Sequence, residues 1–186
     1  MRKRDAEARY RAARNEAFRL AGQELSESMG DELRASLGGS GVVSIRDIDM
    51  EALRAVEPWS RRNRGVSQEW EWDEMRAYFR RKTTSRIEAA IWCDARLLAL
   101  MIGGPCRHCC RVDYWEGDPT LEPPVKGFVE TMVTTVAKAY CLVQKHAEIR
   151  FMEPRQPTGL LLNDLRYESV TPNNKHEQPY LRRLLD

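Results

Sequence analysis

The sequence has few cysteines and no long apolar run, and each shortage excludes a class of protein. Its longest apolar run is far below the roughly 18 to 20 residues that a membrane-spanning helix needs. The Arg-rich N-terminus is not followed by the apolar core of a signal peptide. The cysteines are odd in number and absent from the first 92 residues, which does not suit a secreted disulfide framework. We therefore expect a soluble, cytoplasmic protein that does not contact a membrane and keeps its five thiols free, at Cys93, Cys106, Cys109, Cys110 and Cys141.

Lysine is also scarce, because 24 of the 30 basic residues are Arg. Guanidinium groups bind carboxylates and phosphates in bidentate fashion, so an Arg-rich surface favours an anionic partner, although a GC-rich coding sequence also produces Arg. The net charge of +2 hides an uneven distribution. Residues 1–20 and 59–86 each carry four more basic than acidic side chains, whereas residues 21–58 are acidic.

What is present suits one globular domain with an extension. The chain has 186 residues, of which 42% are hydrophobic and 31% charged, enough apolar material for a packed core. Apolar residues recur at helical intervals over residues 2–37, and the pattern stops at the glycines of 38–41. We expect residues 1–40 to form a helical arm that packs on the core or on a second subunit of a homodimer. A basic arm for nucleic acid is the alternative.

The middle of the chain predicts short helices followed by an antiparallel meander. A strand over residues 42–45 precedes a helix over 47–56, capped by Asp47 or Asp49 and ended by Pro58, and a second helix capped by Asp73. Strands over 86–92 and 96–103 join at a tight turn and lead to a third strand over 110–116. Alternation in that third strand places Val112, Tyr114 and Glu116 on one face, with Asp113 and Trp115 on the other.

The last part of the chain predicts a long helix over residues 127–146, a strand over 147–152 and a short helix over 159–165. A short strand is expected near Tyr167. The polar remainder, residues 171–186, is expected to be a C-terminal tail whose Tyr180, Leu181, Leu184 and Leu185 pack back on the core.

This order of elements, a meander, a loop, a long helix, a strand and a short helix with a Leu-x-x-Leu-x-aromatic sequence, resembles the GNAT superfamily of N-acyltransferases. The resemblance covers about residues 42–170 and implies a mixed α+β fold with a GNAT-like domain over residues 41–170. It implies transfer of an acetyl group from acetyl-CoA, as co-substrate, to an amine acceptor of unknown size by direct attack in a ternary complex. Two alternatives stay open: a GNAT-like scaffold without this chemistry that serves as a binding or regulatory module, and a nucleic-acid-modifying enzyme of the kind some bacteriophages encode.

The resemblance also assigns cofactor-binding residues. In that family the pyrophosphate of acyl-CoA sits on the first N–H groups of the long helix, where the helix dipole favours an anion. The corresponding stretch here is Lys126, Gly127, Phe128 and Val129, of which only Gly127 matches the family's glycine pattern. A second family signature maps onto Leu161–Tyr167, which adds Asn163 to the candidates.

The same mapping suggests catalytic residues. The family's tyrosine, which protonates the leaving thiolate, falls on Leu162, so Tyr167 becomes the candidate acid. An ammonium nucleophile must lose a proton before it attacks a thioester. The carboxylates of Glu116 and Asp113, on the strand before the loop, are the candidate general bases.

Two further groups of residues suggest binding chemistry. Aromatic and basic side chains alternate after Pro58, and such a mixture stacks on bases and binds phosphates; an amphipathic helix with its aromatic side chains inward is the alternative. The candidate substrate-binding residues there are Trp59, Arg61, Arg62, Trp70 and Trp72. The second group, Cys106, His108, Cys109 and Cys110, has half the ligands of a zinc site, and we expect a hairpin tip with ordinary thiols and no metal there.

Overall fold

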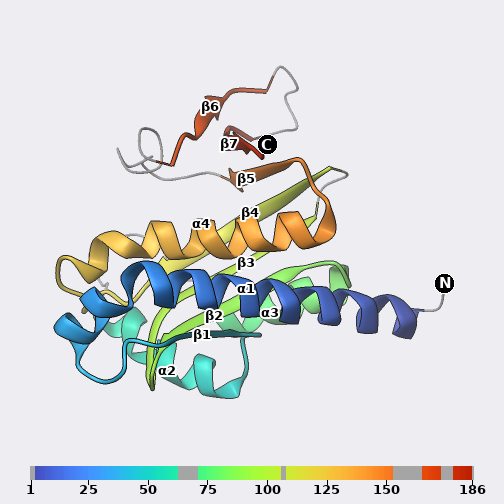
Figure 1. The fold of residues 1–186 in the computed structure, drawn as a ribbon. Helices are drawn as coiled ribbons and strands as arrows, with labels where there is room; N and C mark the ends of the chain where they lie inside the picture. Colours follow the sequence, from blue (N-terminus) through green and yellow to red (C-terminus); the bar gives the residue numbers. More distant parts are fainter. Residues whose placement is uncertain (1–2, 63–70, 106–107, 153–164, 173–177, 186) are drawn as a thin grey trace.

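The chain folds around one mixed sheet of seven strands in the order β1-β2-β3-β4-β5-β7-β6 (Figure 1). The computed structural model describes residues 3–62, 71–105, 108–152, 165–172 and 178–185. Every neighbouring pair of strands is antiparallel except β4 and β5, which are parallel. The expected mixed α+β class is therefore confirmed.

The first four strands form the predicted meander. β1 (Val43–Arg46), β2 (Ile87–Cys93), β3 (Arg96–Pro105) and β4 (Cys109–Gly117) pair in sequence order, and residues 94 and 95 make the turn between β2 and β3. β5 (Glu148–Met152) pairs with the first part of β4 only, ending at the pair Val112 and Phe151. Beyond that pair, residues 113–117 of β4 pair with β3 and with no other strand in the described part of the chain, so β4 and β5 part there.

A β-bulge in β4 overturns the predicted facing of its side chains. Val112 pairs with Gly103, whereas Tyr114 pairs with Ile102, so Asp113 is one extra residue in β4. An extra residue reverses the alternation beyond it. Val112 accordingly lies in the core beneath α4, while Tyr114 packs against the cluster on the opposite face. The prediction that Val112, Tyr114 and Glu116 share one face is therefore wrong.

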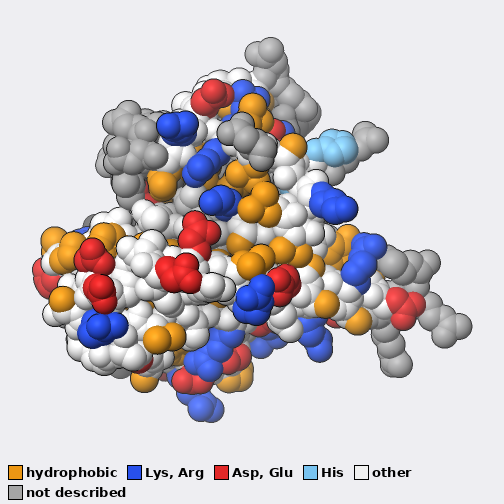
Figure 2. Space-filling view, viewed as in Figure 1, with side chains coloured by type: hydrophobic (Ala, Val, Ile, Leu, Met, Phe, Trp, Pro, Cys, Tyr) orange, Lys and Arg blue, Asp and Glu red, His pale blue; other side chains and the backbone are white. Residues whose placement is uncertain are grey.

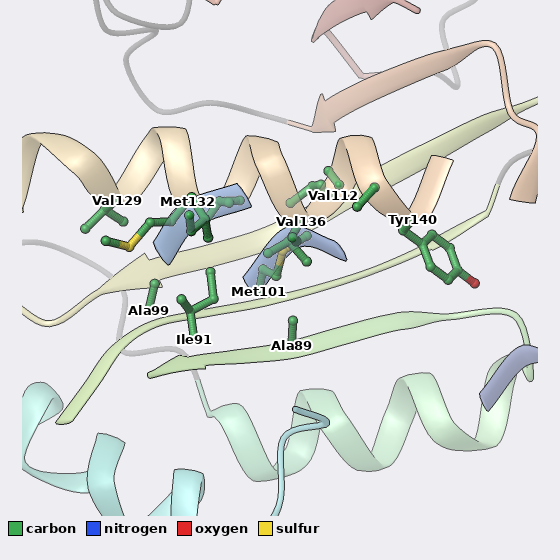
Figure 3. Close-up of a cluster of buried hydrophobic side chains, with 14 of the residues drawn as sticks. Ala89, Ile91, Ala99, Met101, Val112, Val129, Met132, Val136 and Tyr140 are labelled. Atoms are coloured by element: carbon green, nitrogen blue, oxygen red, sulfur yellow. The ribbon is translucent and has the colours of Figure 1, made fainter. Parts of the chain in front are cut away.

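Helices α1 (Lys3–Leu37) and α4 (Val125–Gln144) lie side by side across one face of the sheet (Figure 1). Figure 3 shows side chains of α4 directed at those of β2, β3 and β4, including Met132 and Val136 over Met101 and Ile91. α1 adds Ala17, Ala21, Leu25 and Leu33, all at most 1% exposed, to the same core. The N-terminal helix thus packs on the core, as one of the two interpretations predicted.

The opposite face of the sheet is covered by α2 (Met50–Arg62) and α3 (Trp72–Lys82). The side chain of Asp49 caps α2 by accepting from the N–H of Ala52 at 2.9 Å, as expected. The predicted end at Pro58 is wrong, because α2 continues to Arg62 and buries Trp59 just beyond the proline. Asp73 does not cap α3; it lies in the first turn, where its charge favours the helix dipole.

The C-terminal residues complete the sheet. β6 (Glu168–Val170) forms near Tyr167 as predicted, but β7 (Tyr180–Leu184) was expected only as part of a tail. β7 lies between β5 and β6 and pairs with both. The short helix predicted over residues 159–165 lies almost entirely outside the described residues. None of the described helices is both long and apolar enough to cross a membrane.

A buried ion network ties α1 to the end of the sheet. Arg14, fully buried on α1, donates from Nε to Asp47 at 3.0 Å and lies 3.6 Å from Glu7. Glu7 also pairs with Arg86, which lies 3.4 Å from the fully buried Glu88. Arg80 of α3 completes the chain with a 2.6 Å contact to Glu88. The network therefore links α1, on one face of the sheet, to Arg80 of α3, on the other face.

Candidate active site

The opening between β4 and β5 brings the start of α4 close to the end of β4. A Cβ built on Gly117, the last residue of β4, would lie 2.8 Å from the buried side chain of Val129. This close approach explains why a glycine ends the strand. It also places the first turn of α4 beside the part of β4 that has left β5.

Gly127 in that first turn has no packing reason to be glycine. A Cβ at this position would meet none of the described residues within 4 Å, and the residue is exposed. Lys126 is exposed beside it, Phe128 is half-buried, and Val129 points into the core. Of the predicted cofactor residues, these four lie together at the helix start, and Asn163 lies outside the described residues.

The amide groups of this turn are partly engaged. The N–H of Lys126 donates to the carbonyl of Glu122 at 3.1 Å, and that of Gly127 donates to the carbonyl of Pro124 at 2.9 Å. The positive end of a 20-residue helix, an exposed lysine and an open glycine suit an anion. A pyrophosphate bound here would therefore compete with these two carbonyls for the N–H groups of Lys126 and Gly127.

Glu116 lies on the separated part of β4, on the side of the sheet that α3 covers. The indole N–H of Trp72, the first residue of α3, donates to its Oε2 at 2.9 Å. Trp72 is 4% exposed and belongs to the cluster beneath α2 and α3. The carboxylate is thus held by a rigid, buried ring.

Asp113, the second candidate base, occupies the bulge itself. The Nε of Arg111 lies 2.8 Å from the Oδ1 of Asp113, and the two residues are two positions apart on β4. Burial raises the pKa of Asp113 above its ordinary value, although Arg111 opposes this shift. The ion pair engages one oxygen of this carboxylate, and Oδ2 is buried without a hydrogen-bond partner among the described residues.

Tyr167, the candidate acid, lies in the core. It is 3% exposed and packs edge-on against Phe151, with ring centroids 5.2 Å apart. Burial raises the pKa of the phenol, which therefore stays protonated at neutral pH. Within the described part of the chain, its hydroxyl has no hydrogen-bond partner of normal geometry.

The structure buries the two described tryptophans of the predicted substrate-binding group. Trp59 is 5% exposed and Trp72 4%, so neither presents a ring face to a ligand, and both follow the alternative of aromatic side chains packed inward. Trp70 and the side chains of Arg61 and Arg62 lie outside the described residues. On the α1 and α4 face, basic and acidic side chains are interspersed rather than gathered into one basic patch (Figure 2).

Sequence reasoning missed a groove of about 620 Å³ between α3 and β4. Tyr114 lines it from β4, two residues before Glu116. Glu74 and Tyr78 are four residues apart and therefore lie on one face of α3, and this spacing was the sequence signal that could have indicated the groove. The remaining wall comes from α3: Asp73, Glu74, Met75, Ala77, Tyr78, Phe79 and Arg81. A larger groove of about 710 Å³, between α1 and β1, contains none of the predicted site residues.

The cysteines partly depart from the expectation of free thiols. Cys93, Cys110 and Cys141 are free and buried, but Cys109 is disulfide-bonded. A hydrogen bond between Cys110 and Cys141, together with burial, raises the pKa of Cys110 well above its usual range. The Cys110 thiol is therefore a poor nucleophile. Among the described residues, no three Cys, His, Asp or Glu side chains are grouped to hold a metal ion; Cys106 lies outside them.

The strand order, the opening between β4 and β5 and the long helix that connects them define the GNAT fold. Three solved structures with TM-scores of 0.53 share it: the ribosomal-protein-S18-alanine N-acetyltransferase of Escherichia coli, RimJ of Mycobacterium smegmatis in complex with CoA-disulfide, and a variant of the spermidine N-acetyltransferase SpeG of Vibrio cholerae.

Sequence similarity to these structures is low. The E. coli enzyme is 10% identical in sequence, and the match covers 75% of this chain and 90% of the enzyme. RimJ is 12% identical, with 77% of this chain and 81% of RimJ covered. SpeG is 13% identical, with 77% of this chain and 92% of SpeG covered. No family model matches the sequence, and no curated protein matches it. The chain thus has the fold of the GNAT acetyltransferases, as its element order predicted.

Proposed function

We propose that this protein is an N-acyltransferase that moves an acetyl group from acetyl-CoA to an amine by direct attack in a ternary complex. The observation that carries the proposal is the position of Glu116. It is a carboxylate on the part of β4 beyond the pairs with β5, it accepts a hydrogen bond from Trp72, and it lies two residues after Tyr114, which lines the α3 groove. RimJ, which shares the fold, is described in complex with CoA-disulfide, and this supports the choice of acyl donor.

The donor is proposed to bind with its pyrophosphate at the start of α4. Gly127 leaves room for close approach of the backbone, and Lys126 adds a positive charge. Acetyl-CoA supplies the activated thioester, so the protein has only to bind it, orient it and deprotonate the acceptor. The charge of Lys126 makes binding at this site depend on ionic strength.

The acceptor is proposed to approach from the opposite face, along the groove between α3 and β4. Tyr78 and Tyr114 offer aromatic surface, and Glu74 contributes a negative charge that suits a protonated amine. At the end of this path Glu116 takes the ammonium proton, directly or through one water molecule. The neutral amine then attacks the thioester carbonyl.

Tyr167 stays our candidate for protonating the departing thiolate. A phenol with a raised pKa is a proton donor that keeps its proton until a basic thiolate forms next to it. At 3% exposure, its hydroxyl reaches a thiolate only if the donor enters between α4 and β5.

Calorimetric titration with acetyl-CoA, followed by acetylation of a panel of amines, tests the proposal. Glu116→Gln is expected to lower kcat by about 10² to 10⁴-fold, the range for loss of a general base, and to leave acetyl-CoA affinity unchanged. Glu24→Gln, on the exposed face of α1, is the control and keeps full activity. Absence of binding at millimolar acetyl-CoA would sink the proposal in favour of a binding or regulatory module.

A second experiment tests whether the substrate is a nucleic acid. DNA or RNA binding that weakens with salt, and that is lost in an Arg61→Ala, Arg62→Ala and Arg64→Ala triple variant, would support a nucleic-acid-modifying enzyme. Trp59 and Trp72 are buried, so neither of these two rings supports that alternative by stacking on a base.

A further inference from the structure

The contact between Trp72 and Glu116 joins two elements that are far apart in the sequence. Trp72 begins α3, and Glu116 lies 44 residues later on β4. The indole ring is 4% exposed among the apolar side chains of the α2 and α3 cluster, so it has little freedom to rotate. Its N–H can only donate, and the 2.9 Å distance to Oε2 is that of a bond to a carboxylate.

A second tryptophan of the same cluster shows that such a bond is not a general consequence of burial. Trp92, on β2, is 3% exposed, and its indole N–H is buried without a hydrogen-bond partner among the described residues. Arg46 lies over its ring at 4.4 Å from the centroid. The cluster therefore accepts a tryptophan for its ring alone, and the N–H of Trp72 makes a contact that ring packing does not require.

We infer that Trp72 is a positioning residue for the general base Glu116, an inference that rests on the proposed function. The N–H bond fixes the carboxylate about its last torsion and stabilises the ionised form. Such a bond keeps the base deprotonated at lower pH than a carboxylate without it. The cluster beneath α2 and α3 thereby contributes to both the direction and the basicity of this carboxylate.

The test compares Trp72→Phe with Trp92→Phe. Both variants replace a buried indole by a smaller ring, but only the first removes a donor to Glu116. Trp72→Phe is expected to move the acidic limb of the kcat/KM profile about one pH unit upward, with kcat reduced several-fold and acetyl-CoA affinity unchanged. Trp92→Phe leaves the limb in place. An unmoved limb in Trp72→Phe would overturn the inference.

A measurement on the unmodified protein tests the contact between Trp72 and Glu116 without an activity assay. The indole N–H resonance of Trp72 is expected to shift with pH as Glu116 titrates, and this shift disappears in Glu116→Gln. A Trp72 resonance that ignores pH overturns the inference even if Trp72→Phe does not fold. A resonance that follows pH in a protein that acetylates no amine leaves the contact intact and removes the proposed function instead.

Discussion

At the scale of single residues, two glycines near the start of α4 have opposite reasons for being glycine. Gly117 is required by packing, because a Cβ there would lie 2.8 Å from Val129. A Cβ on Gly127 would meet none of the described residues within 4 Å, and Gly127 sits in a helix, where glycine is less favourable than alanine. A residue that lowers stability without a packing reason points to a functional one.

Gly127→Ala is therefore expected to raise stability and weaken the donor site. The free energy of unfolding should increase by up to about 1 kcal/mol, because alanine favours the helix and its methyl group finds open space. Acetyl-CoA affinity should fall by about tenfold or more, since the methyl group occupies the approach to the backbone. Urea unfolding and calorimetry measure the two effects. An unchanged affinity would show that the pyrophosphate lies elsewhere.

At the scale of elements, α1 is bound to the domain by the buried Arg14 as well as by its apolar side chains. Arg14→Met removes the partner of Asp47 and leaves the carbonyl of Arg86 without its guanidinium. We expect a loss of about 1.5 to 3 kcal/mol in the free energy of unfolding, the range for hydrogen bonds to charged groups, because the carboxylates of Asp47 and Glu7 that remain are partly exposed.

Arg19→Met is the matched control for this substitution. Arg19 pairs with Glu16 on the same helix, but the two side chains are 59% and 50% exposed. An exposed pair contributes little, so the change should stay within about 0.5 kcal/mol. Equal losses in the two variants, measured by chemical denaturation, would contradict the role given to the ion network.

The elements also show how far the sequence could predict this structure. Helical periodicity and glycines predicted α1 to within a residue, and apolar stretches separated by a tight turn predicted the hairpin of β2 and β3. Local rules failed where a contact from elsewhere decided the outcome: the cluster that buries Trp59 carries α2 past Pro58. The bulge at Asp113 could not be read from alternation, because it depends on how Gly103 lies against β4. β7 was missed because its partners, β5 and β6, lie far away in sequence.

The candidate site was predicted in the same uneven way. Family likeness made Gly127 and Glu116 candidates, and both stay predictions, whereas the indole contact of Trp72 became visible only with the packing of α3 on the sheet. Trp59 and Trp72, two of the three tryptophans expected to bind substrate, are core residues, because burying their large apolar area stabilises the fold.

At the scale of the whole molecule, the core on the α1 and α4 face contains two buried tyrosines whose pKa values are raised by burial, Tyr140 and Tyr167. In the unfolded chain a tyrosine ionises near pH 10. A group with a higher pKa in the folded state stabilises the fold fully below its unfolded pKa and loses that contribution as the pH rises. Each tyrosine therefore lowers stability by up to about 1.4 kcal/mol per pH unit above pH 10.

We accordingly expect the two tyrosines together to lower the free energy of unfolding by about 2 to 3 kcal/mol per pH unit above pH 10, measured by urea denaturation between pH 8 and 11. The raised pKa values of Cys93 and Cys110 act in the same direction from about pH 9. Tyr167→Phe should reduce the slope by about half of the tyrosine contribution, at little cost near neutral pH, because its hydroxyl has no hydrogen-bond partner of normal geometry among the described residues. A spectrophotometric titration of the native protein in which all six tyrosines ionise near pH 10 would contradict this prediction.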